Sequence, residues 1–135
     1  MNFSIDQCQN YRDKRGHLIQ FISEKFLSEQ NLGFGQIYLL TFEGKGVVRG
    51  NHYHLNSSEV FCLVQGEIEI ALEDIETRER FSQVFSSNEE PVFRISIGPK
   101  IAHAIKSISE LAILVSYSSK MYDPLNEDKY LYKLL

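Results

Sequence analysis

The sequence lacks the features that would point to nucleic acid or to a membrane. It has no block of basic residues and its formal net charge is -4, whereas binding to a phosphate backbone needs clustered lysine and arginine. No apolar run approaches the roughly 20 residues that cross a bilayer. Residues 1–16 contain no apolar core of the kind found in secretory signal peptides. We therefore expect no nucleic acid partner, no membrane segment and a cytoplasmic location.

Cysteine is scarce as well. The two cysteines, Cys8 and Cys62, form neither a CxxC pair nor the framework of a disulfide-rich domain. A reducing cytoplasm agrees with this usage. Cys62 lies in an apolar run and is predicted to be a small buried residue of a strand, with a reactive thiol as the alternative.

The length and composition indicate one ordinary globular domain. A chain of 135 residues can bury a core but is too short for two domains. Hydrophobic residues make up 43% and charged residues 24%, and no repeat or linker interrupts the chain. We expect a single domain over residues 1–135, with its core at about 35–118 and a short extension at each end.

Short β-like runs separated by turn residues fill the chain from Gly35 onward. In residues 67–73, isoleucine and leucine alternate with glutamate and alanine, which predicts a strand with one buried and one solvent-facing side. The other runs are residues 37–42, 47–54, 60–64, 78–85, 92–97, 101–108 and 111–117. Strands this short and this regularly spaced favour an all-β sandwich or barrel.

The two ends of the chain are harder to interpret. Residues 17–27 fit a strand followed by a helical turn, but periodicity alone does not decide between the two. Residues 123–135 fit either a short helix or an extended arm packed on the outside of the barrel.

One group of residues carries chemistry. His52 and His54 are two apart, so on a strand both side chains point to the same face. Glu59 follows a turn and can face the same interior, and His103 lies in a later β-like run. Three imidazoles and a carboxylate are a sufficient ligand set for Zn, Fe, Mn or Ni. A single HxH pair is more often structural, but three of the four histidines fall in this pattern.

This segment resembles the first motif of the cupin superfamily, G(X)5HXH(X)4E(X)6G. Every defined position matches: Gly46, His52, His54, Glu59 and Gly66. The second motif, PxGxxH, is degraded, because Gly98 replaces the proline and Lys100 the glycine, while His103 is kept. The resemblance implies a cupin barrel (a double-stranded β-helix or jelly roll) and supports these four metal ligands.

A closer resemblance is to cupins that act on nucleotide sugars. It rests on residues 13–16 (DKRG), 49–54 (RGNHYH) and 122–124 (YDP). Similar segments occur in dTDP-sugar 3,4-ketoisomerases and dTDP-4-dehydrorhamnose 3,5-epimerases. RGNHYH most resembles the metal-binding C-terminal cupin domain of bifunctional capsular-polysaccharide enzymes. The resemblance implies an isomerase or epimerase in surface polysaccharide biosynthesis. Its substrate would be a dTDP- or UDP-linked 4-keto-6-deoxy sugar.

The same resemblance suggests roles for individual residues. Arg49, Arg15 and Lys100 are expected to bind the substrate, and the guanidinium of Arg49 suits a diphosphate. For Arg15, a simple ion pair with Asp13 is the alternative. Tyr38 matches a strand tyrosine of the ketoisomerases and is the first candidate for acid–base catalysis. The cofactor would be one divalent transition metal, with zinc expected first and Fe, Mn or Ni as alternatives. A homodimer is expected by analogy.

Two questions remain open at this level. In metal-free relatives the histidine matching His52 is a base, but a metal-bound imidazole has no free lone pair. His52 and His54 are therefore candidates both for catalysis and for metal binding, and Glu59 favours metal binding. Two other functions also fit the ligand set: an iron-dependent oxygenase, and a non-catalytic sugar- or nucleotide-binding cupin. An oxygenase would not need Arg49 to bind a diphosphate.

Overall fold

The chain folds almost entirely into β-strands. The structure is a computed structural model that describes residues 1–135. The strands are β1 Phe3–Gln7, β2 Gln9–Asp13, β3 Gly16–Gln20, β4 Gln36–Glu43, β5 Val48–Tyr53, β6 Glu59–Gln65, β7 Glu67–Asp74, β8 Arg80–Ser86, β9 Phe93–Ile97, β10 Ile101–Ser107, β11 Leu111–Ser118 and β12 Tyr130–Leu131. The single helix is α1 Glu24–Glu29. No helix is long and apolar enough to span a membrane.

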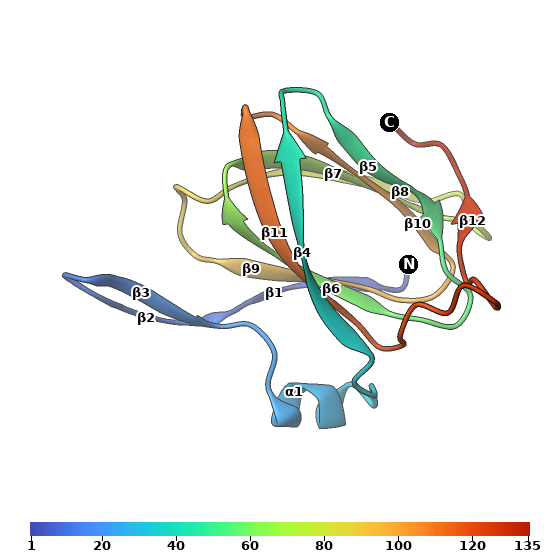
Figure 1. The fold of residues 1–135 in the computed structure, drawn as a ribbon, viewed down its shortest axis with the longest axis horizontal. Coiled ribbons are helices and arrows are strands. Elements are labelled where there is room, and N and C mark those ends of the chain that lie inside the picture. Colours follow the sequence, from blue (N-terminus) through green and yellow to red (C-terminus); the bar gives the residue numbers. More distant parts are fainter.

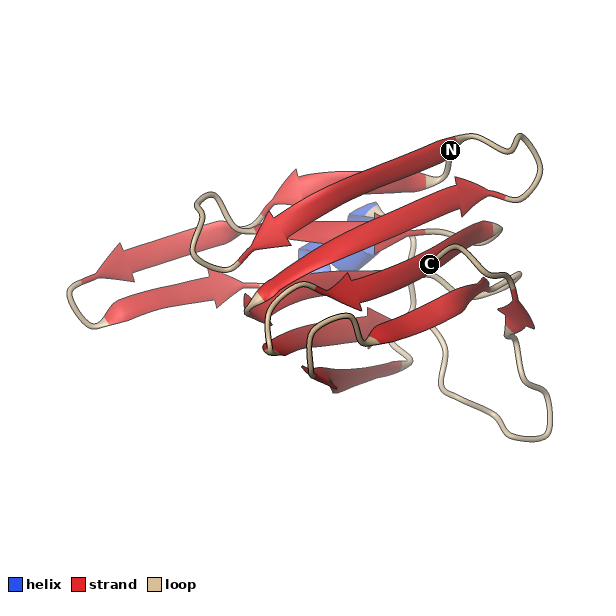
Figure 2. Cartoon of the chain, turned by 90° about the horizontal axis from the view of Figure 1, so that it is seen from above, coloured by secondary structure: helices blue, strands red, loops and turns tan.

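Two antiparallel five-stranded sheets face each other (Figures 1 and 2). We call them sheet A, with strand order β1-β9-β6-β11-β4, and sheet C, with order β12-β5-β10-β7-β8. Strands that are neighbours in a sheet are often distant in the sequence, as in a jelly roll. The predicted all-β cupin barrel is confirmed.

The core lies between the two sheets. Ile68, Ile70 and Leu72 point inward from β7 and are at most 1% exposed, as the alternating pattern predicts. They pack in one cluster with Phe61 and Leu114 of the facing sheet. Burial of this apolar surface is the main force that holds the two sheets together.

The solvent-facing side of β7 departs from its prediction at one residue. Glu73 belongs to the predicted wet face but is only 2% exposed. The C-terminal arm lies over it, and the hydroxyl of Tyr132 in the arm contacts its carboxylate. The side chains of Arg78 and Arg80 contact the same carboxylate. The simple alternation failed here because a segment almost 60 residues later covers the outer face of the sheet.

The N-terminal part of the chain contributes more than expected. Strand β1 pairs with β9 along the edge of sheet A, and Phe3 and Ile5 pack against the core. The predicted core of about 35–118 leaves out β1, because this strand is only five residues long and has only two apolar residues, Phe3 and Ile5. Strands β2 and β3 form a separate hairpin that extends away from the barrel (Figure 1).

The segment of residues 17–27 contains both a strand and a helical turn, as predicted. Ser23 caps α1, its side chain accepting a hydrogen bond from the Phe26 amide at 3.0 Å. Phe26 then packs against Val60 and Tyr117 on the outer face of sheet A. The helix thereby covers one end of that face.

Residues 123–135 form the extended arm, and no helix. Strand β12 adds to the edge of sheet C, with Tyr130 opposite Tyr53 and Leu131 opposite His52. The end of the arm is held by Asn51, whose side-chain oxygen accepts hydrogen bonds from the Leu134 and Leu135 amides. The arm therefore runs directly beside the strand that carries the candidate histidines (Figure 1).

Candidate metal centre

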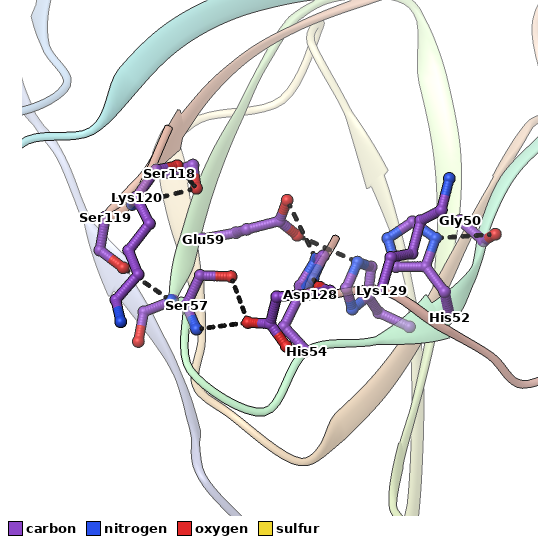
Figure 3. A network of polar contacts seen from close by, with 12 residues as sticks. Gly50, His52, His54, Ser57, Glu59, Ser118, Ser119, Lys120, Asp128 and Lys129 are labelled. Carbon is purple, nitrogen blue, oxygen red and sulfur yellow. Dashed lines mark hydrogen bonds and ion pairs between the residues drawn. The ribbon is translucent and has the colours of Figure 1, made fainter. Parts of the chain in front are cut away.

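The four predicted ligands lie together inside one end of the barrel. His52 is in β5 and directly opposite His103 of β10. His54 follows the end of β5, and Glu59 begins β6 in the facing sheet. One ligand atom from each residue lies within 4.8 Å of every other (Figure 3). The period-two argument for His52 and His54 therefore holds; strand pairing adds His103, and the packing of the facing sheet adds Glu59.

Each of the three imidazoles is oriented by a backbone carbonyl. Nδ1 of His52 lies 3.1 Å from the carbonyl oxygen of Gly50, and Nδ1 of His103 lies 3.2 Å from that of Ile101. Nδ1 of His54 contacts the carbonyl oxygen of Asp128. A carbonyl oxygen can only accept a hydrogen bond, so every Nδ1 is the donor. In the neutral rings all three Nε2 atoms therefore carry a lone pair, the state that binds a metal.

Two buried atoms in this cluster have no hydrogen-bond partner. Nε2 of His54 lies 3.4 Å from Oε1 of Glu59, and Nε2 of His103 lies 3.0 Å from Oε2. These distances suit ion pairs, but Nε2 of His54 and Oε2 of Glu59 make no hydrogen bond. Unpartnered buried polar atoms are rare and call for an explanation such as an ion.

The donor set fits a first-row transition metal. Ligands bound at roughly 2.1 Å are at most about 4.2 Å apart, so a separation of up to 4.8 Å needs only small inward shifts. Nitrogen donors with one carboxylate suit zinc, iron, manganese or nickel better than calcium or magnesium.

The charges inside the cluster are consistent with such a site. Burial, together with the rings of His103 and His54, lowers the pKa of His52 to about 4, so this imidazole is neutral at pH 7. Burial opposes the charge on His54, but the Glu59 carboxylate outweighs it and raises the pKa of His54. Burial alone would raise the pKa of Glu59, yet His103 and His54 hold it well below its usual range. Glu59 is therefore a buried carboxylate that needs positive charge beside it.

Tyr38 lies against this cluster. Its hydroxyl donates a hydrogen bond to Oε1 of Glu59 at 3.0 Å. Burial and the Glu59 carboxylate both raise the pKa of Tyr38, so the hydroxyl is protonated at neutral pH. The sequence predicted Tyr38 as an acid–base residue, and its location gives it access to the site as a proton donor.

A cavity of about 400 Å³ opens in front of the cluster. Its walls come from β4, β5, β6, the end of β11 and the C-terminal segment. Lining residues include Gln36, Tyr38, His52, His54, Ser57, Glu59, Ser118, Lys120, Asp128 and Lys129. Metal ligands, a tyrosine hydroxyl and two lysines thus share one cavity.

The three predicted substrate-binding residues lie outside the cavity lining. Arg15 is on the projecting hairpin, where its guanidinium pairs with Asp13 at 2.6 Å. Lys100 pairs with Glu76 at 2.7 Å. Nε of Arg49 donates a hydrogen bond to the carbonyl oxygen of Thr41 at 3.0 Å. Each has a partner within the chain.

Several lining residues were not predicted from the sequence. Lys120, Asp128 and Lys129 follow the last core strand, in a segment with no periodic pattern. The Asp-Pro turn at Asp123 signals only that the chain changes direction there. Nothing local indicates that the segment returns to the histidines, since this depends on long-range packing.

Known structures share this fold. The sugar 3,4-ketoisomerase QdtA from Thermoanaerobacterium thermosaccharolyticum, solved with TDP, is 22% identical with a TM-score of 0.78, over 96% of this chain and 87% of that one. The 3,5-epimerase RmlC from Legionella pneumophila, solved with dTDP-4-keto-L-rhamnose, is 20% identical with a TM-score of 0.83, over 98% and 73%. The capsular polysaccharide assembling protein CapF from Staphylococcus aureus is 21% identical with a TM-score of 0.69, over 94% of this chain and 34% of CapF.

No curated protein sequence matches the chain at a significant level. One family model does match, over residues 11–130, and it describes the polysaccharide biosynthesis C-terminal domain. This match covers the barrel except β1, the four clustered ligands and most of the C-terminal segment. The chain therefore belongs to the family of polysaccharide biosynthesis C-terminal domains.

Proposed function

We propose that this chain is a metal-binding nucleotide-sugar isomerase or epimerase. It would act on a dTDP- or UDP-linked 4-keto-6-deoxy sugar, by removing a proton next to the keto group. The observation that carries the proposal is the convergence of one ligand atom from each of four residues, His52, His54, Glu59 and His103, within 4.8 Å beside a cavity. Relatives of similar fold are named as a ketoisomerase and an epimerase of such sugars, and the family name supports a role in polysaccharide synthesis.

The metal would be one divalent transition ion, with zinc as the first candidate. His52, His54, Glu59 and His103 would hold it. When bound, the ion supplies a Lewis acid that polarises the keto oxygen of the substrate. Oε2 of Glu59 is buried without a hydrogen-bond partner, and this supports a cation at this point.

The acid–base work would fall to residues other than the ligands. The Nδ1 atoms of His52 and His54 donate to carbonyls, so neither ring keeps a free lone pair once Nε2 is coordinated. We propose that these two residues are ligands and do not act as the base. Tyr38 lines the cavity with its hydroxyl hydrogen-bonded to Glu59, and it is the first candidate for this acid–base work.

The cavity volume of about 400 Å³ lies within the roughly 300–1,000 Å³ common for small-molecule sites. Lys120 and Lys129 are its basic lining residues. We propose that they contact the diphosphate in place of Arg49, Arg15 and Lys100, none of which lines the cavity. A homodimer is part of the same proposal. It rests on exposed apolar side chains on the outer face of sheet A, namely Ile37, Leu39, Val64 and Leu111.

The test combines metal analysis with proton exchange. Elemental analysis of the wild-type protein should find about one equivalent of a transition metal, and His52→Ala and Glu59→Ala should lose it. In D2O, the loaded protein should introduce deuterium into a ring carbon of a dTDP- or UDP-linked 4-keto-6-deoxyglucose, and both variants should not.

Other outcomes would contradict the proposal and identify an alternative. Nucleotide-sugar binding without deuterium incorporation would indicate a binding module. Oxygen uptake by the Fe(II)-loaded protein, again without deuterium exchange, would indicate an oxygenase. A metal-free wild-type protein that still catalyses exchange would return His52 or His54 to the role of base.

A further inference from the structure

The three clustered histidines are not oriented in the same way. Nδ1 of His52 and of His103 each reach a carbonyl two residues earlier in the same strand. These two contacts form wherever the strands form. Nδ1 of His54 instead reaches the carbonyl of Asp128, 74 residues later in the C-terminal segment. Of the three rings, only His54 depends on a distant part of the chain for its orientation.

The side chain of Asp128 also forms hydrogen bonds with the turn between His54 and Glu59. One carboxylate oxygen accepts the Leu55 amide at 2.8 Å, and the other accepts the amides of Asn56 at 2.9 Å and Ser57 at 3.1 Å. The second oxygen also accepts the Ser57 hydroxyl at 3.3 Å. Asp128 thus satisfies three consecutive backbone donors between His54 and Glu59. Figure 3 shows its contacts with Ser57.

These contacts connect the C-terminal arm to the turn between His54 and Glu59, and we call this set of contacts the Asp128 bracket. The carboxylate fixes the position of the Asp128 backbone relative to the turn. That in turn aims the Asp128 carbonyl at Nδ1 of His54. A carboxylate that accepts several backbone amides forms charge-assisted bonds, which are stronger than neutral ones. The neighbours Glu127 and Lys129 are exposed, so Asp128 is the residue that anchors this stretch.

We infer that Asp128 is a positioning residue of the metal centre, which sets the tautomer and the ring orientation of His54. This inference rests on the proposed metal site. The carbonyl holds the proton of His54 on Nδ1, so that Nε2 presents its lone pair towards Glu59, His52 and His103. Partners of this kind change metal affinity by roughly 10- to 100-fold in other proteins when they are removed.

The test uses Asp128→Ala and Asp128→Asn, with Tyr132→Phe as a matched control. Tyr132→Phe removes a hydrogen bond of the same arm to Glu73 but leaves the contacts of His54 intact. Asp128→Asn keeps one acceptor oxygen and replaces the other with an amide that cannot accept from the turn. It therefore reports on the bracket even if Asp128→Ala were to destabilise the fold.

Two readouts separate positioning from general stability. At a pH above the raised pKa of His54, where the ring is neutral, long-range ¹⁵N–¹H NMR of the metal-free protein reports which ring nitrogen of each histidine carries the proton. Competition with a chromophoric chelator gives the zinc affinity. Asp128→Ala should move His54 to a mixture of tautomers, leave His52 and His103 unchanged, and weaken zinc binding roughly 10- to 100-fold. Asp128→Asn should have an intermediate effect, and Tyr132→Phe should behave as wild type.

Two results would overturn the inference. The first is an Asp128→Ala variant with wild-type His54 tautomer and wild-type zinc affinity. The second is a Tyr132→Phe variant with the same loss as Asp128→Ala, since the arm as a whole would then be responsible. If the wild-type protein bound no zinc, the proposed function would fail. The tautomer of His54 in the metal-free protein would still decide whether Asp128 orients the ring.

Discussion

At the scale of single residues, His52 is a neutral imidazole held among two others. Its pKa in the folded protein is lowered to about 4, from 6.5 in the unfolded chain. Between these values the unfolded chain binds more protons, so stability falls as the pH falls. The pKa of His54 is shifted in the opposite direction, upwards. This shift changes the pH dependence of stability only above pH 6.5, because below that pH His54 is protonated in both the folded and the unfolded chain.

We therefore predict that the metal-free protein loses stability as the pH falls from 6.5 to about 5. In this window His52 titrates in the unfolded chain, while most carboxylates are still ionised in both states. His52→Gln should flatten this part of the profile of melting temperature against pH, measured with a chelator present.

His17→Gln is the control for loss of a histidine, because His17 lies on the projecting hairpin. An unchanged pH profile in His52→Gln would mean that the imidazole is not held neutral in the folded protein.

The sequence predicts the ligand set better than it predicts what surrounds it. His52 and His54 share a face because strand side chains alternate, and this rule needs no knowledge of the fold. His103 joins them through the pairing of β10 with β5, and Glu59 joins them from the facing sheet. The Asp128 bracket and the burial of Glu73 depend on where the C-terminal arm docks, and no local pattern records that.

At the scale of elements, tight turns fix how successive strands pair. Gly66 joins β6 to β7 with a φ of +95°, and a Cβ at this position would overlap the carbonyl oxygen of Leu111. Gly46 precedes β5 with a φ of +82°, but a Cβ there would meet nothing within 4 Å. Both glycines belong to the first cupin motif, yet only Gly66 is enclosed.

This difference yields a matched pair of variants. Gly46→Ala should cost about 1–2 kcal/mol, the strain of a left-handed backbone in a residue with a Cβ. Gly66→Ala adds a clash with the backbone of β11 and should cost roughly 3 kcal/mol or more. Urea unfolding of the two variants measures both values. Equal losses would contradict the steric role of Gly66.

The elements that the sequence predicted are those with a strong pattern. β7 was clear because three fully buried residues alternate with polar ones. β1 and β2 were missed because they are short and mostly polar, and β1 gains its place only by pairing with β9. The arm remained undecided between helix and extended chain because neither periodicity is present in it.

At the scale of the whole molecule, one broad surface remains apolar. Ile37, Leu39, Val64 and Leu111 lie on the outer face of sheet A and are 49%, 69%, 55% and 42% exposed. Helix α1 covers only the end of this face, at Tyr117. Contiguous exposed apolar residues of this kind mark contact surfaces. Strand β4 is also an unpaired edge, which proteins usually cover.

A second copy of this chain is the partner that we expect on this face. Leu39→Glu places a charge on this face, at its most exposed apolar residue, and should convert a dimer into a monomer, because a buried unpaired charge is strongly unfavourable. Leu125→Glu is the control, since Leu125 is 96% exposed in the C-terminal segment, away from sheet A. Sedimentation velocity should give two chain masses for the wild type and for Leu125→Glu, and one for Leu39→Glu.

Since Leu39 points away from the cavity that Tyr38 lines, the monomeric variant should keep its metal. A wild-type monomer, or a Leu39→Glu dimer, would remove this face from consideration as the interface.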